Sequence, residues 1–67
     1  MDKFLFMKKM ASAGYTQRSY AEKAGISKNT LNAKINGKSK IDTMFIAQAC
    51  DLLHIVDQGE KVEIFLK

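Results

Sequence analysis

Residues 28–36, KNTLNAKIN, carry amide and ammonium groups where a fully buried helix would carry apolar side chains. At about 3.6 residues per turn, a helix here places Lys28, Asn29, Asn32 and Ala33 on one side. Asparagine can form two hydrogen bonds with adenine, lysine can donate to guanine, and alanine can contact the methyl group of thymine. These residues are therefore candidates for contact with base edges in the major groove of DNA. The alternative is an ordinary solvent-exposed face, although asparagine has only modest helix propensity.

Residues on either side of this segment suit contacts with the phosphate backbone of DNA. Gln17 begins an earlier helical segment, where free backbone N–H groups and a side-chain amide can hold a phosphate. Ser27 directly precedes the polar helix, and Asn36, Lys38 and Lys40 follow it. These five residues are the candidates for backbone contact.

The charge distribution along the chain favours a polyanionic partner. The net charge is +4, but residues 17–40 hold six Lys or Arg against one Glu, a net charge of +5. Residues 41–67 hold two Lys against five Asp or Glu, a net charge of −3. A basic block of this kind is typical of a nucleic-acid-binding surface. On charge alone, a solvated lysine-rich surface is an equal alternative.

Two short helices joined by a tight turn would position the candidate residues. Thr16 can cap a helix over 17–24, and Ser27 can cap a helix from 28 to about 36. Gly25 lies between them and supplies the positive φ that a tight turn between helices commonly needs. The residues that would face the core are Tyr20, Ala21, Ala24, Leu31 and Ile35.

Two further helices are expected around this pair. One runs from residue 2 to about 13, and its core positions at near-helical spacing are Phe4, Leu5, Met7 and Ala11. The other runs to about residue 53, is the most apolar segment, and has Asp42 or Thr43 as its N-cap.

The C-terminal segment 57–67 fits two patterns. Asp57 followed by Glu60 resembles a capping box, which indicates a short helix, whereas alternating Val62, Ile64 and Leu66 indicate a strand. We favour the helix. A small core has limited room for apolar side chains, and Phe65 and Leu66 near the C-terminus go beyond it. They are therefore candidates for a homodimer contact.

Composition limits the possible function classes. A chain of 67 residues is expected to form one domain over 1–67. Cys50 is its single cysteine, so neither a disulfide nor a Cys/His zinc site is expected, and a reducing cytoplasm fits. No apolar run reaches the length of a membrane span, and no export signal is expected. No nucleophile–base pair, carboxylate pair or phosphate loop is present, so we expect no enzyme, no cofactor and no small-molecule substrate.

The spacing Gln17-x3-Ala21-x3-Gly25-Ile26-Ser27-x3-Leu31, followed by Asn36-Gly37-Lys38, resembles the helix-turn-helix of the phage repressor and Cro family of XRE-type transcriptional regulators. The resemblance covers about residues 3–56. It implies an all-α, compact four- to five-helix bundle of the lambda-repressor-like DNA-binding type, with the helix-turn-helix at about 17–36.

The resemblance also implies roles for individual residues. The family's reading positions match Gln17, Lys28, Asn29, Asn32 and Ala33, and its phosphate-contact positions match Asn36, Lys38 and Lys40. The chain departs from the family pattern at Ser19 and Tyr20, which replace the usual acidic residue and leucine of the second helix. That departure affects any inherited base preference and leaves the fold unchanged.

The sequence thus predicts a regulator that binds specific double-stranded DNA. The resemblance implies a Cro-like repressor, bacterial or phage-encoded, acting in the cytoplasm at the nucleoid as a homodimer on a pseudo-palindromic operator. The alternative is a protein-interaction module, antitoxin- or anti-repressor-like, that uses the same fold without binding DNA.

Overall fold

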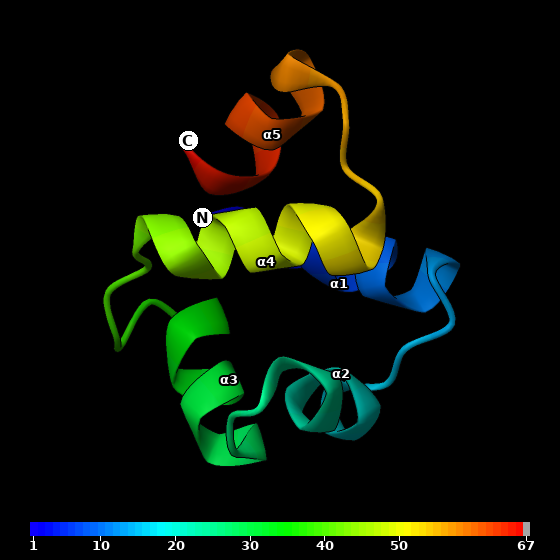
Figure 1. Cartoon of the computed structure of the whole chain (residues 1–67). Coiled ribbons are helices and arrows are strands. Elements are labelled where there is room, and N and C mark those ends of the chain that lie inside the picture. Colours follow the sequence, from blue (N-terminus) through cyan, green and yellow to red (C-terminus); the bar gives the residue numbers. More distant parts are fainter. Residues whose placement is uncertain (67) are drawn as a thin grey trace.

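The computed structural model describes residues 1–66, and every regular element in that range is a helix (Figure 1). The helices are α1 (Lys3–Ser12), α2 (Gln17–Ala24), α3 (Lys28–Ile35), α4 (Thr43–Leu53) and α5 (Gln58–Phe65). In Figure 1, α4 crosses the middle of the molecule, with α2 and α3 at one end and α5 at the other. The prediction of an all-α bundle of four to five helices is confirmed.

Each helix begins after a residue whose side-chain oxygen accepts a hydrogen bond from the first turn. Such caps satisfy N–H groups that have no acceptor within the helix. The predicted caps Thr16 and Ser27 accept from the N–H groups of Ser19 and Thr30. Of the two candidates before α4, Asp42 is the cap. Because these interactions are local, the helix bounds lie close to those expected from sequence.

The C-terminal segment forms helix α5, so the helix is confirmed over the strand up to residue 66, and Lys67 lies outside the described residues. The expected capping box is wrong. Asp57 Oδ1 accepts from the Gly59 N–H at 2.8 Å, one residue earlier than a capping box requires. Glu60 instead forms an ion pair with Lys9 of α1 at 3.0 Å, so its carboxylate links two helices.

Phe6 of α1 lies at the centre of the core. The centroid of its ring is 5.6 Å from that of Tyr20 in α2, 5.9 Å from Phe45 in α4, and 6.1 Å from Phe65 in α5. Leu31 of α3 is also fully buried in the same cluster. One aromatic side chain therefore joins α1, α2, α4 and α5, and Leu31 adds α3 to the same core.

The inward face of α1 differs from the expected one. Phe6 and Met10 are buried, whereas Phe4 is 81% exposed and Ala11 is exposed. Leu5 packs at the edge of the core. Residues 4–7 are all apolar, so periodicity allows more than one inward face. Contact with the other helices decides that Phe6 and Met10, at i and i+4, face the core.

Phe65 is also placed differently from the prediction, because it is a core residue and not a free surface for a second subunit. It is only 7% exposed and packs edge-on against Phe6. The reason is that α5 folds back onto α1, where the Asp2 N–H donates to the Ile64 carbonyl oxygen at 2.7 Å. Leu66, in contrast, stays 66% exposed.

Within residues 1–66, no helix has the length and apolar character that crossing a bilayer requires.

Candidate nucleic-acid interface

The turn between α2 and α3 fixes the angle at which α3 is presented. Gly25 has a φ of +74°, in the left-handed region that glycine adopts without steric cost. The Ile26 N–H then donates back to the Ala21 carbonyl oxygen at 3.0 Å, which closes the turn against the last part of α2. Ala21 is itself buried, so a small side chain allows α3 to pack closely over α2. In Figure 1 these two helices form one end of the molecule.

A side chain of α4 forms a hydrogen bond with the end of α2, next to the turn. Gln48 Nε2 donates to the carbonyl oxygen of Ala24, the last residue of α2, at 3.1 Å. The last carbonyl groups of a helix receive no hydrogen bond from an N–H group of the same helix, so a donor from elsewhere must satisfy them. Gln48 is such a donor for Ala24. The contact ties the turn to α4, 24 residues further along the chain.

The first turn of α3 is the most accessible part of the predicted base-reading face. Lys28 and Asn29 are exposed, whereas Asn32 and Ala33 on the next turn are half-buried. Leu31 is fully buried on the opposite side of the helix. A helix with its N-terminal turn projecting and its rear side in the core has the shape needed to enter the major groove.

Ser27 precedes this turn and is engaged within the protein. Its Oγ accepts from the Thr30 N–H at 3.0 Å and lies 2.8 Å from the Thr30 hydroxyl. Ser27 is exposed, but its hydroxyl is shared between the cap and Thr30. Its first role is to cap α3.

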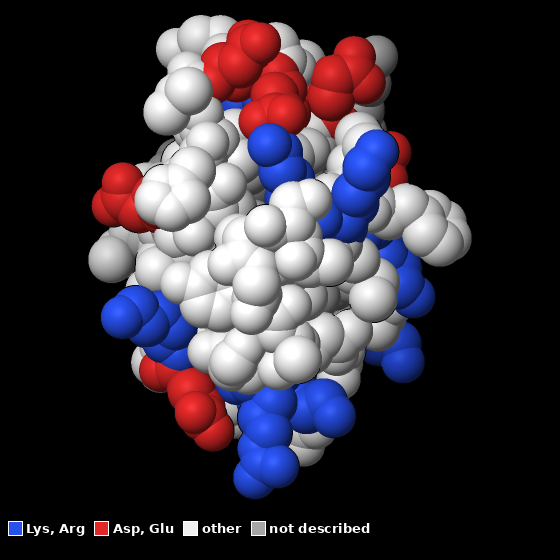
Figure 2. Space-filling view, turned by 90° about the vertical axis from the view of Figure 1, so that its right-hand side faces the viewer, with Lys and Arg blue, Asp and Glu red and all other residues white. Residues whose placement is uncertain are grey.

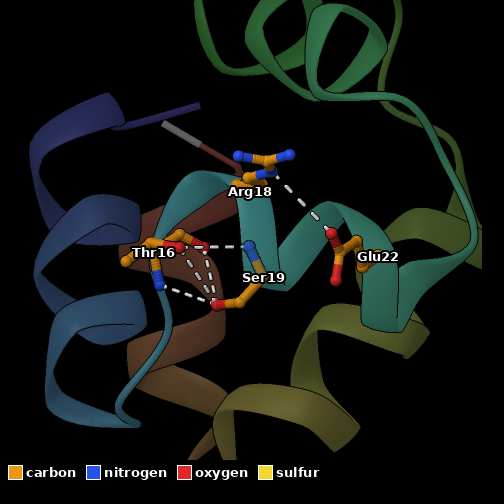
Figure 3. Close-up of polar contacts among 4 residues, drawn as sticks. All are labelled: Thr16, Arg18, Ser19 and Glu22. Atoms are coloured by element: carbon orange, nitrogen blue, oxygen red, sulfur yellow. Dashed lines mark hydrogen bonds and ion pairs between the residues drawn. The ribbon is translucent and has the colours of Figure 1, made fainter.

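The start of α2 lies at the same end of the molecule and offers backbone donors. Thr16 and Ser19 cap each other's backbone (Figure 3), which leaves the N–H groups of Gln17 and Arg18 without a partner in the helix. Gln17 is half-buried, and Arg18 projects into solvent with its Nε 3.9 Å from Glu22 Oε1. In the sequence Arg18 is part of the basic block, and its position one residue after Gln17 marks it as a further candidate contact.

The loop between α3 and α4 carries the remaining candidates. Asn36, Lys38 and Lys40 are all exposed. The N–H groups of Lys38 and Ser39 both donate to the Ala33 carbonyl oxygen, at 2.8 Å and 3.1 Å. The first half of the loop is thus folded back against the end of α3, which places Lys38 beside that end of the helix.

Acidic side chains gather towards one end of the molecule. On the face shown in Figure 2, Asp and Glu side chains lie mostly at the end where α5 lies, whereas Lys and Arg side chains lie across the middle of the face as well as at the end where α2 lies. All six Lys or Arg residues of the basic block belong to α2, α3 or the loop that follows α3. Among residues 1–66, no group of three or more His, Cys, Asp or Glu could hold a metal ion.

Comparison with known proteins gives one finding. The model of a family described as helix-turn-helix matches residues 6–56, which include α2, α3 and α4 entirely. No curated protein and no solved structure matches the chain.

Proposed function

The chain belongs to the helix-turn-helix family found in phage repressors, a family of DNA-binding transcription regulators, and from this premise we propose that it is a sequence-specific, Cro-like repressor. The observation that carries this proposal is the exposed first turn of α3 with Lys28 and Asn29, flanked by the free N–H groups of α2 and by a lysine-bearing loop. Groove-reading and phosphate-binding groups thus occupy one end of the molecule.

In the proposed complex α3 enters the major groove. Lys28 and Asn29 reach base edges first, because the N-terminal residues of a recognition helix lie closest to the bases. Asn32 and Ala33 contact the next bases along the groove. Because Asn32 and Ala33 are half-buried, they project less far from the protein surface than Lys28 and Asn29 do.

The phosphate backbone is held on both sides of this helix. Gln17 and the N-terminus of α2 bind one strand, and Asn36, Lys38 and Lys40 bind the flanking strand. Ser27 contributes a backbone contact through its exposed hydroxyl while it caps α3. Because cation–phosphate contacts release counterions, affinity falls steeply as salt concentration rises.

A homodimer supplies the affinity that one module lacks. A single module of this kind buries only about 600–1,000 Å² on DNA. Val62 on α5 and the C-cap residue Leu66 are exposed at i and i+4, and Val56 just before α5 is also exposed. These apolar residues are the proposed dimer surface, in place of the buried Phe65. A two-fold dimer then favours a pseudo-palindromic operator with half-sites about one helical turn apart. In this proposal the operator lies in a bacterial or a phage genome.

The proposal is tested by fluorescence anisotropy with a random duplex of about 25 base pairs, titrated at several salt concentrations. We expect micromolar binding that weakens with salt, and a shallower salt dependence for the variant Lys38→Ala/Lys40→Ala. Selection from random duplexes then identifies the operator. No binding at low salt by a folded, helical protein would reject the proposal and would favour a module that binds an acidic protein through its basic end.

A further inference from the structure

The ammonium group of Lys34 joins α3 to the far half of the α3–α4 loop. Its Nζ donates to the carbonyl oxygen of Lys40 at 2.9 Å and lies 5.4 Å above the centroid of the Phe45 ring. Phe45 belongs to the core and stacks on Phe6. The ammonium is thus fixed from two sides, by a hydrogen bond and by a cation–π contact.

This contact complements the backbone bonds of the loop. The N–H groups of Lys38 and Ser39 donate to the Ala33 carbonyl oxygen, which fixes the first half of the loop against α3. Lys40 is reached instead by the side chain of Lys34. The loop between these two attachments carries the cations that are proposed to bind phosphate.

We propose that Lys34 is a positioning residue for DNA binding, holding the 36–42 loop so that Lys38 and Lys40 face the phosphate backbone. This inference rests on the proposed function. Lys34 is half-buried beside the core, unlike the exposed Lys38 and Lys40. Its ammonium points to the protein's own carbonyl oxygen and ring, so it acts through the loop. Without it, the two lysines sample many orientations, and ordering them on DNA costs conformational entropy.

The test is a double-mutant cycle. Lys34→Met keeps the aliphatic stem but removes the ammonium, and it is made in the wild-type chain and in Lys38→Ala/Lys40→Ala. Affinity for a random duplex is measured against salt concentration. We expect Lys34→Met to weaken binding about 3- to 10-fold in the wild-type chain and less than about twofold in the double variant, because coupled residues are not additive.

Two controls separate positioning from other effects. Lys23→Met removes the same charge from an exposed position in the last turn of α2, and Lys34→Arg keeps both charge and donor. Lys34→Arg is expected to bind like wild type. The salt slope is the slope of log affinity against log salt concentration, and one lost phosphate contact changes it by ~0.9. In the wild-type background, Lys34→Met is expected to make this slope shallower by more than that amount, because two lysines are affected. Thermal melting confirms that each variant is folded; if Lys34→Met is not, Lys34→Gln replaces it in the same cycle.

Loop order gives a readout that does not depend on DNA. In Lys34→Met, 15N relaxation is expected to show increased mobility of the amides of residues 39–41, with α3 unchanged. An unchanged loop, or an equal Lys34→Met penalty in both backgrounds, would overturn the inference, since Lys34 would then be acting directly or through bulk charge. If the wild-type protein binds no DNA, the proposed function fails, while the relaxation data still decide whether Lys34 orders the loop.

Discussion

Thr16 and Ser19 cap the start of α2 reciprocally. The Ser19 N–H donates to Thr16 Oγ1 at 3.1 Å, and the Thr16 N–H donates to Ser19 Oγ at 2.9 Å (Figure 3). A capping box usually has Glu or Gln in the position of Ser19. Serine completes the box without placing a negative charge beside a surface that is proposed to meet phosphate. The departure from the family pattern at this position therefore keeps the cap and removes a charge.

We predict that Thr16→Ala lowers the free energy of unfolding by about 0.5–2 kcal/mol, the usual cost of a lost N-cap. Ser19→Glu is expected to keep the stability, since glutamate can complete the box, but to weaken DNA binding by charge repulsion. Urea denaturation measures the first effect and anisotropy the second. Ser19→Gln can complete the box without adding the charge, and it should leave DNA affinity nearly unchanged. Equal losses for Ser19→Glu and Ser19→Gln would contradict a phosphate contact at α2.

Asn29 and Lys38 are expected to differ in what their removal costs. Asn29→Ala should weaken binding to the selected operator by about 1–3 kcal/mol and change random-duplex binding little, because a base contact carries sequence information. Lys38→Ala should weaken both by similar amounts and reduce the salt slope. Anisotropy titrations on the two duplexes give this comparison. If Asn29→Ala loses equal affinity on both, Asn29 does not read a base.

Phe65 is expected to behave as a core residue. Phe65→Ala should lower the free energy of unfolding by about 3–5 kcal/mol, because it leaves a cavity against the Phe6 ring. In a domain this small, that loss is a large part of the total stability. Thermal and urea denaturation measure it. A change below about 1 kcal/mol would mean that α5 does not pack on α1 in solution.

Leu66 and Val62 are expected to act at the dimer surface. Leu66→Ser and Val62→Ser should leave the helix content unchanged and shift the protein from dimer to monomer. Sedimentation equilibrium measures the shift. Operator affinity should fall with it, because each subunit then binds its half-site independently. Phe4→Ser, at an exposed apolar position on α1, is the matched control and should leave the oligomeric state unchanged. A dimer that persists in both the Leu66→Ser and the Val62→Ser variant would place the interface elsewhere.

Tyr20 makes stability depend on pH in the alkaline range. Its hydroxyl is buried and has no hydrogen-bond partner among residues 1–66, and burial, followed by the neighbouring Tyr15 and Cys50, raises its pKa to about 12. The unfolded state releases this proton near pH 10, but the folded state keeps it up to about pH 12. The free energy of unfolding should therefore fall as pH rises between these values.

Tyr20→Phe is expected to remove this part of the alkaline loss and to raise stability at pH 7 by up to about 1–3 kcal/mol, since no unpaired hydroxyl remains buried. Urea denaturation at pH 7, 10 and 11.5 tests both effects. Tyr15→Phe serves as the comparison, because it removes the hydroxyl of the other tyrosine, whose ring packs edge-on against Tyr20. A Tyr20→Phe variant that is less stable than wild type would show that the hydroxyl has a partner in solution.

The sequence by itself determined the helices and the polar face of α3. Thr16, Ser27 and Asp42 cap helices through bonds that span three residues, and Gly25 turns the chain through its own φ. Such features depend on neighbours in the chain, so they can be derived from local patterns. The basic block and the spacing from Gln17 to Lys38 likewise indicated the family.

Only the tertiary structure decided which apolar residues face inward and how the loop is held. Phe6 rather than Phe4 enters the core, and Phe65 turns inward, because α5 packs against α1 more than 50 residues away in the chain. Lys34 binds the Lys40 carbonyl oxygen and the Phe45 ring, two contacts that its place in the helical pattern does not specify. These outcomes depend on the mutual placement of whole helices, and a periodic pattern within one segment carries no information about that placement.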